Sequence, residues 1–145
     1  MTIASLATGS SQLRPSSAPV FVVDDDAAVL DSLQSLLDAE GFAVAGFESG
    51  ATALPAIARD PPACLVLDLH MPVLGGLELM DQLAARGIRL PVVVITGRFD
   101  RKTTQRALAA GASAVLRKPF DHAELMDAID RALATGPGNA PAGHT

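Results

Sequence analysis

Five short apolar segments alternate along the chain with longer segments in which apolar residues recur every three or four positions. Three of the short segments are almost uninterrupted runs of Val, Ile and Leu, as expected for parallel strands that are covered on both faces. The alternation predicts five strand–helix units within one α/β domain. The predicted strands lie at residues 19–24, 42–46, 63–68, 91–96 and 113–117.

Glycines indicate where three of the predicted helices end. Gly41, Gly87 and Gly111 each follow a helical apolar pattern, at the position where a glycine commonly ends a helix. The first and third of the five patterns are the clearest, with apolar residues on one helix face. Their apolar residues are Val29, Leu30, Leu33, Leu36 and Leu37 in the first, and Leu77, Met80, Leu83 and Ala84 in the third.

The second and last helices carry further local signals. Pro55 lies within the second pattern, at about residues 50–58, and predicts a kink or a late helix start. Asp121 and Glu124 have the spacing of a capping box and predict the start of the last helix. Five such units in succession predict a doubly wound parallel sheet, with right-handed crossovers that place helices on both faces.

The two ends of the chain differ in composition from this domain, predicted at residues 19–134. Residues 1–18 are rich in Ser, Thr, Ala and Pro without apolar periodicity, which predicts a disordered arm. Residues 135–145 are rich in Gly and Pro and predict a flexible tail. This tail is compatible with a natural single-domain protein and with a domain cut from a longer one.

Composition narrows the class of protein. The 145 residues have a net charge of −5, which does not suggest non-specific nucleic-acid binding. The single cysteine, Cys64, excludes an intramolecular disulfide and lies in an apolar strand, where a buried, inert thiol is expected. No signal peptide is recognisable, and no apolar run approaches the roughly 20 residues that span a bilayer. We therefore expect a soluble cytoplasmic protein without membrane partners.

Acidic residues follow two of the predicted strands. Asp24, Asp25 and Asp26 come directly after the first strand, and Asp68 ends the third. Parallel strands share an edge at their carboxyl ends, where open α/β sheets bind ligands, so these carboxylates are expected to converge. A run of three acids is also common in a solvated turn or at a helix N-terminus. Asp26 fits that second description, as the N-cap of the following helix.

The other carboxylates suit a divalent cation. Carboxylates a few ångströms apart repel one another unless a cation lies among them, and oxygen ligands favour Mg²⁺ or Mn²⁺. Beside a metal ion and an ammonium group, Asp68 could attack phosphorus and become an acyl phosphate. A role as a metal ligand alone is the alternative.

Lys118 and Thr96 are predicted to lie at the same carboxyl edge of the sheet. Lys118 follows the fifth strand, and we expect it to pair with Asp68 and then with phosphoryl oxygens, or to form only a structural ion pair. The bond between Lys118 and Pro119 is a candidate cis peptide. Thr96 ends the fourth strand, where its hydroxyl is expected to face the crevice and donate to a phosphoryl oxygen, although a threonine at a strand end is a weak signal.

Taken together, these residues resemble the receiver domain of bacterial two-component response regulators, most closely the FixJ-like group. The resemblance covers about residues 19–134 and implies a flavodoxin-like fold with strand order 2-1-3-4-5. The motifs that carry it occur in the expected order: Val-Val-Asp-Asp-Asp, Leu-Asp-Leu-His-Met-Pro with Gly76, Ile-Thr-Gly, Ala-Gly-Ala and Lys-Pro-Phe.

The resemblance implies a role for each site residue. Asp68 would be the phosphoacceptor, with Asp25 as a direct Mg²⁺ ligand and Asp24 acting on the metal through water. The backbone carbonyl of His70 would be a further ligand. Thr96 would be the switch hydroxyl and Lys118 the family's lysine. The donor would be a phosphohistidine on a sensor histidine kinase or a phosphotransfer protein.

Three positions are expected to modify this behaviour. Val115 stands where the family usually has an aromatic ring that turns inward on phosphorylation, so the signal is expected to pass more weakly or by another route. His70 and Arg98 lie two residues beyond Asp68 and Thr96, and we expect them to tune phosphate lifetime, with Arg98 slowing dephosphorylation. A zinc role for His70 is not expected, because no histidine cluster accompanies it.

Arg98, Lys102 and Arg106 form a basic stripe at the start of the fourth helix. It is either an ordinary solvated helix face or a docking surface for an acidic partner. Dimerisation through the fourth helix, fifth strand and fifth helix is a further expectation from the family.

The sequence thus predicts a phosphorylation-dependent signalling module that binds a partner or relays phosphoryl groups, and not an enzyme. A pseudo-receiver scaffold is the alternative, and Val115 favours it. The intact site residues oppose it: Asp24, Asp25, Asp68, Thr96 and Lys118. A metal-dependent phosphohydrolase of the haloacid-dehalogenase type is a weaker third interpretation, because such enzymes have a second aspartate where this chain has His70.

Overall fold

The predicted alternation of strands and helices is present in the computed structural model, which describes residues 18–98 and 100–136. The predicted arm and tail lie almost entirely outside these residues. The strands are β2 (Val20–Val23), β3 (Val44–Phe47), β4 (Cys64–Asp68), β5 (Val92–Thr96) and β6 (Ala114–Arg117). The helices are α2 (Ala27–Ala39), α3 (Gly50–Arg59), α4 (Gly76–Ala85), α5 (Arg101–Ala109) and α6 (His122–Thr135).

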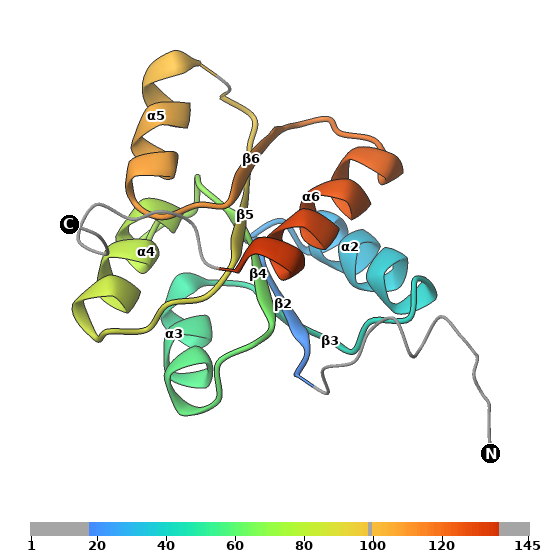
Figure 1. Ribbon diagram of the computed structural model, residues 1–145, viewed down its shortest axis with the longest axis horizontal. Coiled ribbons are helices and arrows are strands. Elements are labelled where there is room, and N and C mark those ends of the chain that lie inside the picture. Colours follow the sequence, from blue (N-terminus) through green and yellow to red (C-terminus); the bar gives the residue numbers. More distant parts are fainter. Residues whose placement is uncertain (1–17, 99, 137–145) are drawn as a thin grey trace.

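All five strands are parallel and form one sheet in the order β3-β2-β4-β5-β6. This is the order 2-1-3-4-5 that the resemblance implied, and it is confirmed. Helices α2 and α6 cover one face of the sheet, whereas α3, α4 and α5 cover the other (Figure 1). From β2 the chain adds β3 on one side of the sheet and then β4, β5 and β6 on the other, so the topological switch point lies between β2 and β4. Doubly wound sheets bind ligands at such a point.

The strands divide their side chains between two apolar cores. Phe21 and Val23 of β2 pack on the side of α3, α4 and α5, whereas Val20 and Val22 pack on the side of α2 and α6. This alternation is the period-two geometry of a strand. Because both faces are covered, the central strands β2, β4 and β5 are buried along their whole length, which explains their continuous apolar sequences.

The local signals for helix ends are confirmed. Gly41, Gly87 and Gly111 have φ angles of 96°, 72° and 111°, a left-handed conformation that glycine adopts without steric penalty. Asp121 and Glu124 form the predicted capping box, with reciprocal hydrogen bonds of 2.9 and 2.8 Å.

Pro55 led to the prediction of either a kink or a late start in the second helix, and the late start is wrong. Helix α3 begins at Gly50, before Pro55, and continues to Arg59. Two features hold its first turn in place. The Ser49 hydroxyl accepts a hydrogen bond from the Thr52 amide, and Ala53 is completely buried in the core. Pro55 itself lies on the exposed side of the helix, so its ring does not disturb this packing.

Candidate functional site

The carboxyl ends of four strands bring the predicted site residues to one edge of the sheet. Asp68 and Thr96 are the last residues of β4 and β5, Asp24 directly follows β2, and Lys118 directly follows β6. The strand register places Asp68 opposite Ile95, one residue before Thr96. Asp24, Asp68 and Lys118 line one cleft there, whereas Thr96 is buried and does not line it.

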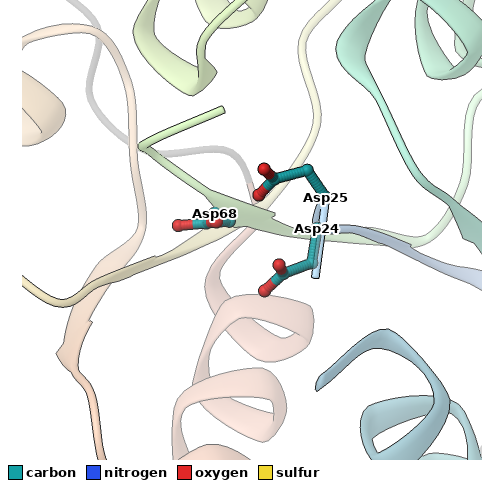
Figure 2. A group of neighbouring side chains, drawn as sticks. All are labelled: Asp24, Asp25 and Asp68. Atoms are coloured by element: carbon teal, nitrogen blue, oxygen red, sulfur yellow. The ribbon is translucent and has the colours of Figure 1, made fainter. Parts of the chain in front are cut away.

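Three carboxylates meet in this cleft. Asp24, Asp25 and Asp68 extend toward the same side of the ends of β2 and β4 (Figure 2), and each offers an oxygen within 4.8 Å of the others. Asp24 and Asp68 are buried, whereas Asp25 is exposed. Asp26 turns instead toward its own helix, where its side chain accepts hydrogen bonds from the amides of Ala28 and Val29, as predicted for an N-cap.

The electrostatic environment of Asp68 is unusual for a carboxylate. Burial and, secondarily, the negative charge of Asp24 raise the pKa of Asp68 from 3.8 to about 6. The charge of Lys118 and a 3.3 Å hydrogen bond from the His70 amide act in the opposite direction without cancelling these effects. A cation bound beside Asp68 would therefore stabilise its ionised form.

Lys118 reaches the carboxylates, but its closer partner differs from the predicted one. Its ammonium Nζ lies 3.2 Å from Oδ2 of Asp24 and 3.7 Å from Oδ2 of Asp68. The expected pairing with Asp68 alone is therefore incomplete, because Asp24 is the more deeply buried carboxylate and competes for the same ammonium. The bond between Lys118 and Pro119 is cis, as the sequence suggested. The Lys118 amide donates to the Thr96 carbonyl at 2.9 Å, which ties this segment to the edge of β5.

The donor set fits a hard divalent cation. All three clustered side chains offer carboxylate oxygens, and the pKa of Asp68 stays raised because the Lys118 ammonium does not offset burial and the nearby charge of Asp24. Mg²⁺ and Mn²⁺ favour oxygen ligands of this kind and retain several waters. Asp24, Asp25 and Asp68 are thus suited to hold the predicted metal ion.

His70 and Arg98 flank the site, as expected from their positions in the sequence. Both line the cleft above the carboxylates. Arg98 also lines a second cleft, between the segment after β4 and helix α5, which it shares with Arg106 and Glu78. The three residues of the predicted basic stripe, Arg98, Lys102 and Arg106, are exposed. The stripe is not entirely helical as predicted, because α5 begins at Arg101 and Arg98 precedes it. The complete lining of the first cleft is Asp24, Asp25, Asp26, Asp68, His70, Gly97, Arg98 and Lys118.

The Thr96 hydroxyl has partners that sequence reasoning did not find. Thr96 is completely buried and is not among the residues that line the cleft. Its Oγ1 lies 3.0 Å from Nε2 of His70, accepts from the Arg98 amide at 2.9 Å and donates to the Arg98 carbonyl at 3.2 Å. The available signal was the strand order implied by the family resemblance, which places the ends of β4 and β5 side by side but does not specify side-chain contacts.

Val115 occupies the middle of β6 and is half-buried. It packs against the core on the side of α3, α4 and α5. Its side chain thus fills the space between β6 and neighbouring elements with two methyl groups in place of a ring.

Comparisons with known proteins agree with the fold and the motifs. Residues 20–130 match the family model described as the response regulator receiver domain. The transcriptional regulatory protein FixJ of Azorhizobium caulinodans is 42% identical over 119 residues, which cover 82% of this chain and 56% of FixJ. The response regulator protein TodT of Pseudomonas putida is 36% identical over 137 residues, which cover 92% of this chain and 60% of TodT.

Solved structures give the same result. The crystal structure of FixJ-N superposes with a TM-score of 0.76 at 36% identity, covering 81% of this chain and 94% of that one. The low-resolution structure of the response regulator StyR gives a TM-score of 0.74 at 43% identity, covering 81% and 60%. Within the described residues, no helix is both long and apolar enough to cross a membrane.

The chain spans little more than half the length of the curated relatives named above. The match to the family model, over residues 20–130, extends from the start of β2 into α6. Sequence motifs, sheet order and the carboxylate cluster at the sheet edge all agree with this match. The chain therefore belongs to the response regulator receiver domain family.

Proposed function

We propose that this domain accepts a phosphoryl group on Asp68 from a phosphohistidine of a sensor histidine kinase or a phosphotransfer protein. The observation that carries the proposal is the buried Asp68 at the end of β4, within 4.8 Å of two further carboxylates and 3.7 Å from the Lys118 ammonium. A lone structural carboxylate has no need of this arrangement. We place the reaction in the cytoplasm, as the family resemblance implies.

The residues divide the work of the transfer. An Oδ atom of Asp68 forms a bond to phosphorus while the phosphorus–nitrogen bond of the donor imidazole breaks, and the imidazole departs with its electron pair. The Lys118 ammonium, which faces both Asp24 and Asp68, stabilises charge on the phosphoryl oxygens. Thr96 donates its hydroxyl to one of these oxygens after it leaves its present partners.

A Mg²⁺ ion would be held by Asp25, Asp68 and the backbone carbonyl of His70 directly, and by Asp24 through water. When bound, it would neutralise charge on Asp68 and on the incoming phosphoryl group. The raised pKa of Asp68 supports this role, because burial and the charge of Asp24 disfavour the ionised carboxylate and a cation bound beside it would offset both effects.

The phosphorylated state would signal by binding a protein partner. Two surfaces suit this role: the basic stripe of Arg98, Lys102 and Arg106 for an acidic partner, and the α5-β6-α6 face for a second copy of the domain. Arg98 lines the cleft and is proposed to slow the approach of water to the acyl phosphate. Val115 is proposed to transmit the change weakly, because it has no ring to reorient.

Intact-protein mass spectrometry after incubation with acetyl phosphate tests the proposal. A mass increase of one phosphoryl group is expected with Mg²⁺. The increase should be absent when EDTA removes the metal and absent in Asp68→Ala. Asp31→Ala is the matched control, because Asp31 is an exposed acid on α2 outside the cluster and its loss should leave the reaction intact. Modification that persists in Asp68→Ala would contradict the assignment, and a complete lack of modification would favour a phosphorylation-independent scaffold.

A further inference from the structure

The buried Thr96 hydroxyl already uses its full hydrogen-bonding capacity. A hydroxyl has one proton to donate and two lone pairs that accept. The Thr96 Oγ1 has three partners to match: the Arg98 amide at 2.9 Å, the Arg98 carbonyl at 3.2 Å and Nε2 of His70 at 3.0 Å. A phosphoryl oxygen on Asp68 only accepts, so it needs the proton that the hydroxyl now donates to the Arg98 carbonyl. To donate that proton elsewhere, the hydroxyl must turn away from its present partners, His70 among them.

Only one of these three contacts joins different strands of the sheet. The two bonds to Arg98 lie within the turn that follows β5, two residues from Thr96, and can move together with it. The bond to His70 bridges from the segment after β4 to the end of β5. The backbone holds this bridge in register, because the Leu69 amide donates to the Ile95 carbonyl at 3.0 Å.

His70 contacts both the Thr96 hydroxyl and the reacting carboxylate. Its side chain is exposed and lines the same cleft as Asp68, whereas Thr96 is completely buried. Its amide donates to Oδ1 of Asp68 at 3.3 Å, so the residue contacts the phosphoacceptor with its backbone and Thr96 with its imidazole.

We propose that His70 is a positioning residue whose imidazole retains the Thr96 hydroxyl in the unphosphorylated domain and opposes its turn toward the phosphoryl group. The inference rests on the proposed phosphorylation of Asp68. A neutral hydrogen bond of this kind has a net strength that corresponds to about a two- to twelvefold change in an equilibrium constant. Loss of the imidazole should thus favour the phosphorylated arrangement by that factor.

A bulky side chain at this position could instead act by covering the cleft. The two explanations differ in their dependence on Thr96. A contact with the hydroxyl has no effect once the hydroxyl is absent, whereas simple coverage of the cleft persists. A double-mutant cycle between His70 and Thr96 therefore separates them.

The experiment measures binding of beryllofluoride with Mg²⁺, a stable stand-in for the phosphoryl group, by amide chemical shifts. His70→Leu, which lacks ring nitrogens, should bind about two- to twelvefold more tightly than the unmodified domain. His70→Gln, whose side-chain amide can reach a similar position, should restore much of the original affinity. His122→Leu is the matched control. His122, the first residue of α6, lies outside the cleft, and its Nε2 is 2.8 Å from Oε2 of Glu40.

Two further readouts complete the test. In a Thr96→Val background, His70→Leu should have no effect on the affinity for beryllofluoride. In the unmodified domain, the Nε2 resonance of His70 should shift when beryllofluoride binds. An unchanged or weaker affinity in His70→Leu, or an equal gain with Thr96→Val present, would overturn the role of His70. Failure of the unmodified domain to bind beryllofluoride would contradict the proposed phosphorylation and this inference together. That result differs from normal binding by the unmodified domain without an effect of His70→Leu, which would contradict the role of His70 alone. Thermal unfolding monitored by circular dichroism verifies that every variant is folded.

Discussion

Replacing Asp68 with asparagine should stabilise the metal-free domain at neutral and alkaline pH. In the folded protein the pKa of Asp68 is about 6, compared with 3.8 for an ordinary aspartate, mainly because the side chain is buried and secondarily because Asp24 is close. Above pH 6 the carboxylate is ionised in the folded and the unfolded chain alike, so the folded state bears the full cost of the buried charge. An amide carries no charge and still offers an oxygen to the His70 amide.

The size of the effect follows from the pKa difference. At about 1.4 kcal/mol per pH unit, a rise from 3.8 to about 6 sets a ceiling of about 3 kcal/mol. Solvent in the open cleft screens part of this interaction, so we expect a gain of about 1–2 kcal/mol in the free energy of unfolding.

The sign of the pH dependence gives the stricter test. As the pH falls through 6 toward 4, the folded state takes up a proton that the unfolded state does not, and the cost disappears. The advantage of Asp68→Asn should therefore be present at about pH 8 and largely lost at about pH 4. Added Mg²⁺ should stabilise the unmodified domain at about pH 8 and narrow or reverse the difference.

Urea unfolding in EDTA, monitored by circular dichroism at both pH values, measures the difference; the chain has no Trp or Tyr for fluorescence. Equal gains at both pH values would show that Asp68→Asn acts through packing and not through charge. The absence of a gain at about pH 8 would refute the argument that Asp68 is an electrostatically strained carboxylate.

Three further predictions concern other positions. A Cβ at Gly76 would lie 2.7 Å from the Asp68 carbonyl oxygen and 2.8 Å from the Leu69 Cα, so Gly76→Ala should lower the free energy of unfolding by about 1–3 kcal/mol and slow phosphorylation by acetyl phosphate. Val73 is exposed with a φ of 68°, which a β-branched residue rarely adopts, so Val73→Asn should raise that free energy by about 1 kcal/mol; an unchanged urea midpoint would contradict this. Burial raises the pKa of the Cys64 thiol to about 12, so iodoacetamide should label it only after unfolding. Rapid labelling of the folded domain, detected by mass spectrometry, would argue against that burial.

Local sequence signals determined the secondary structure and much of the site. Apolar runs marked the strands and glycines marked helix ends, because periodicity and backbone conformation depend on neighbouring residues. Asp26 was identifiable as an N-cap for the same reason. The prediction of a late start for α3 was wrong because Pro55 was weighed without the burial of Ala53, which is a tertiary property.

Only the tertiary structure decided which partners the site residues have. Strand ends predicted that Asp24, Asp68, Thr96 and Lys118 would meet, because parallel strands share their carboxyl edge. They did not predict that Lys118 lies nearer to Asp24, 94 positions away, or that His70 binds Thr96, 26 positions away. Such contacts depend on side-chain direction and on the competition of several groups for one ammonium or one hydroxyl. These are settled by packing of the whole domain, and no local pattern of residues encodes them.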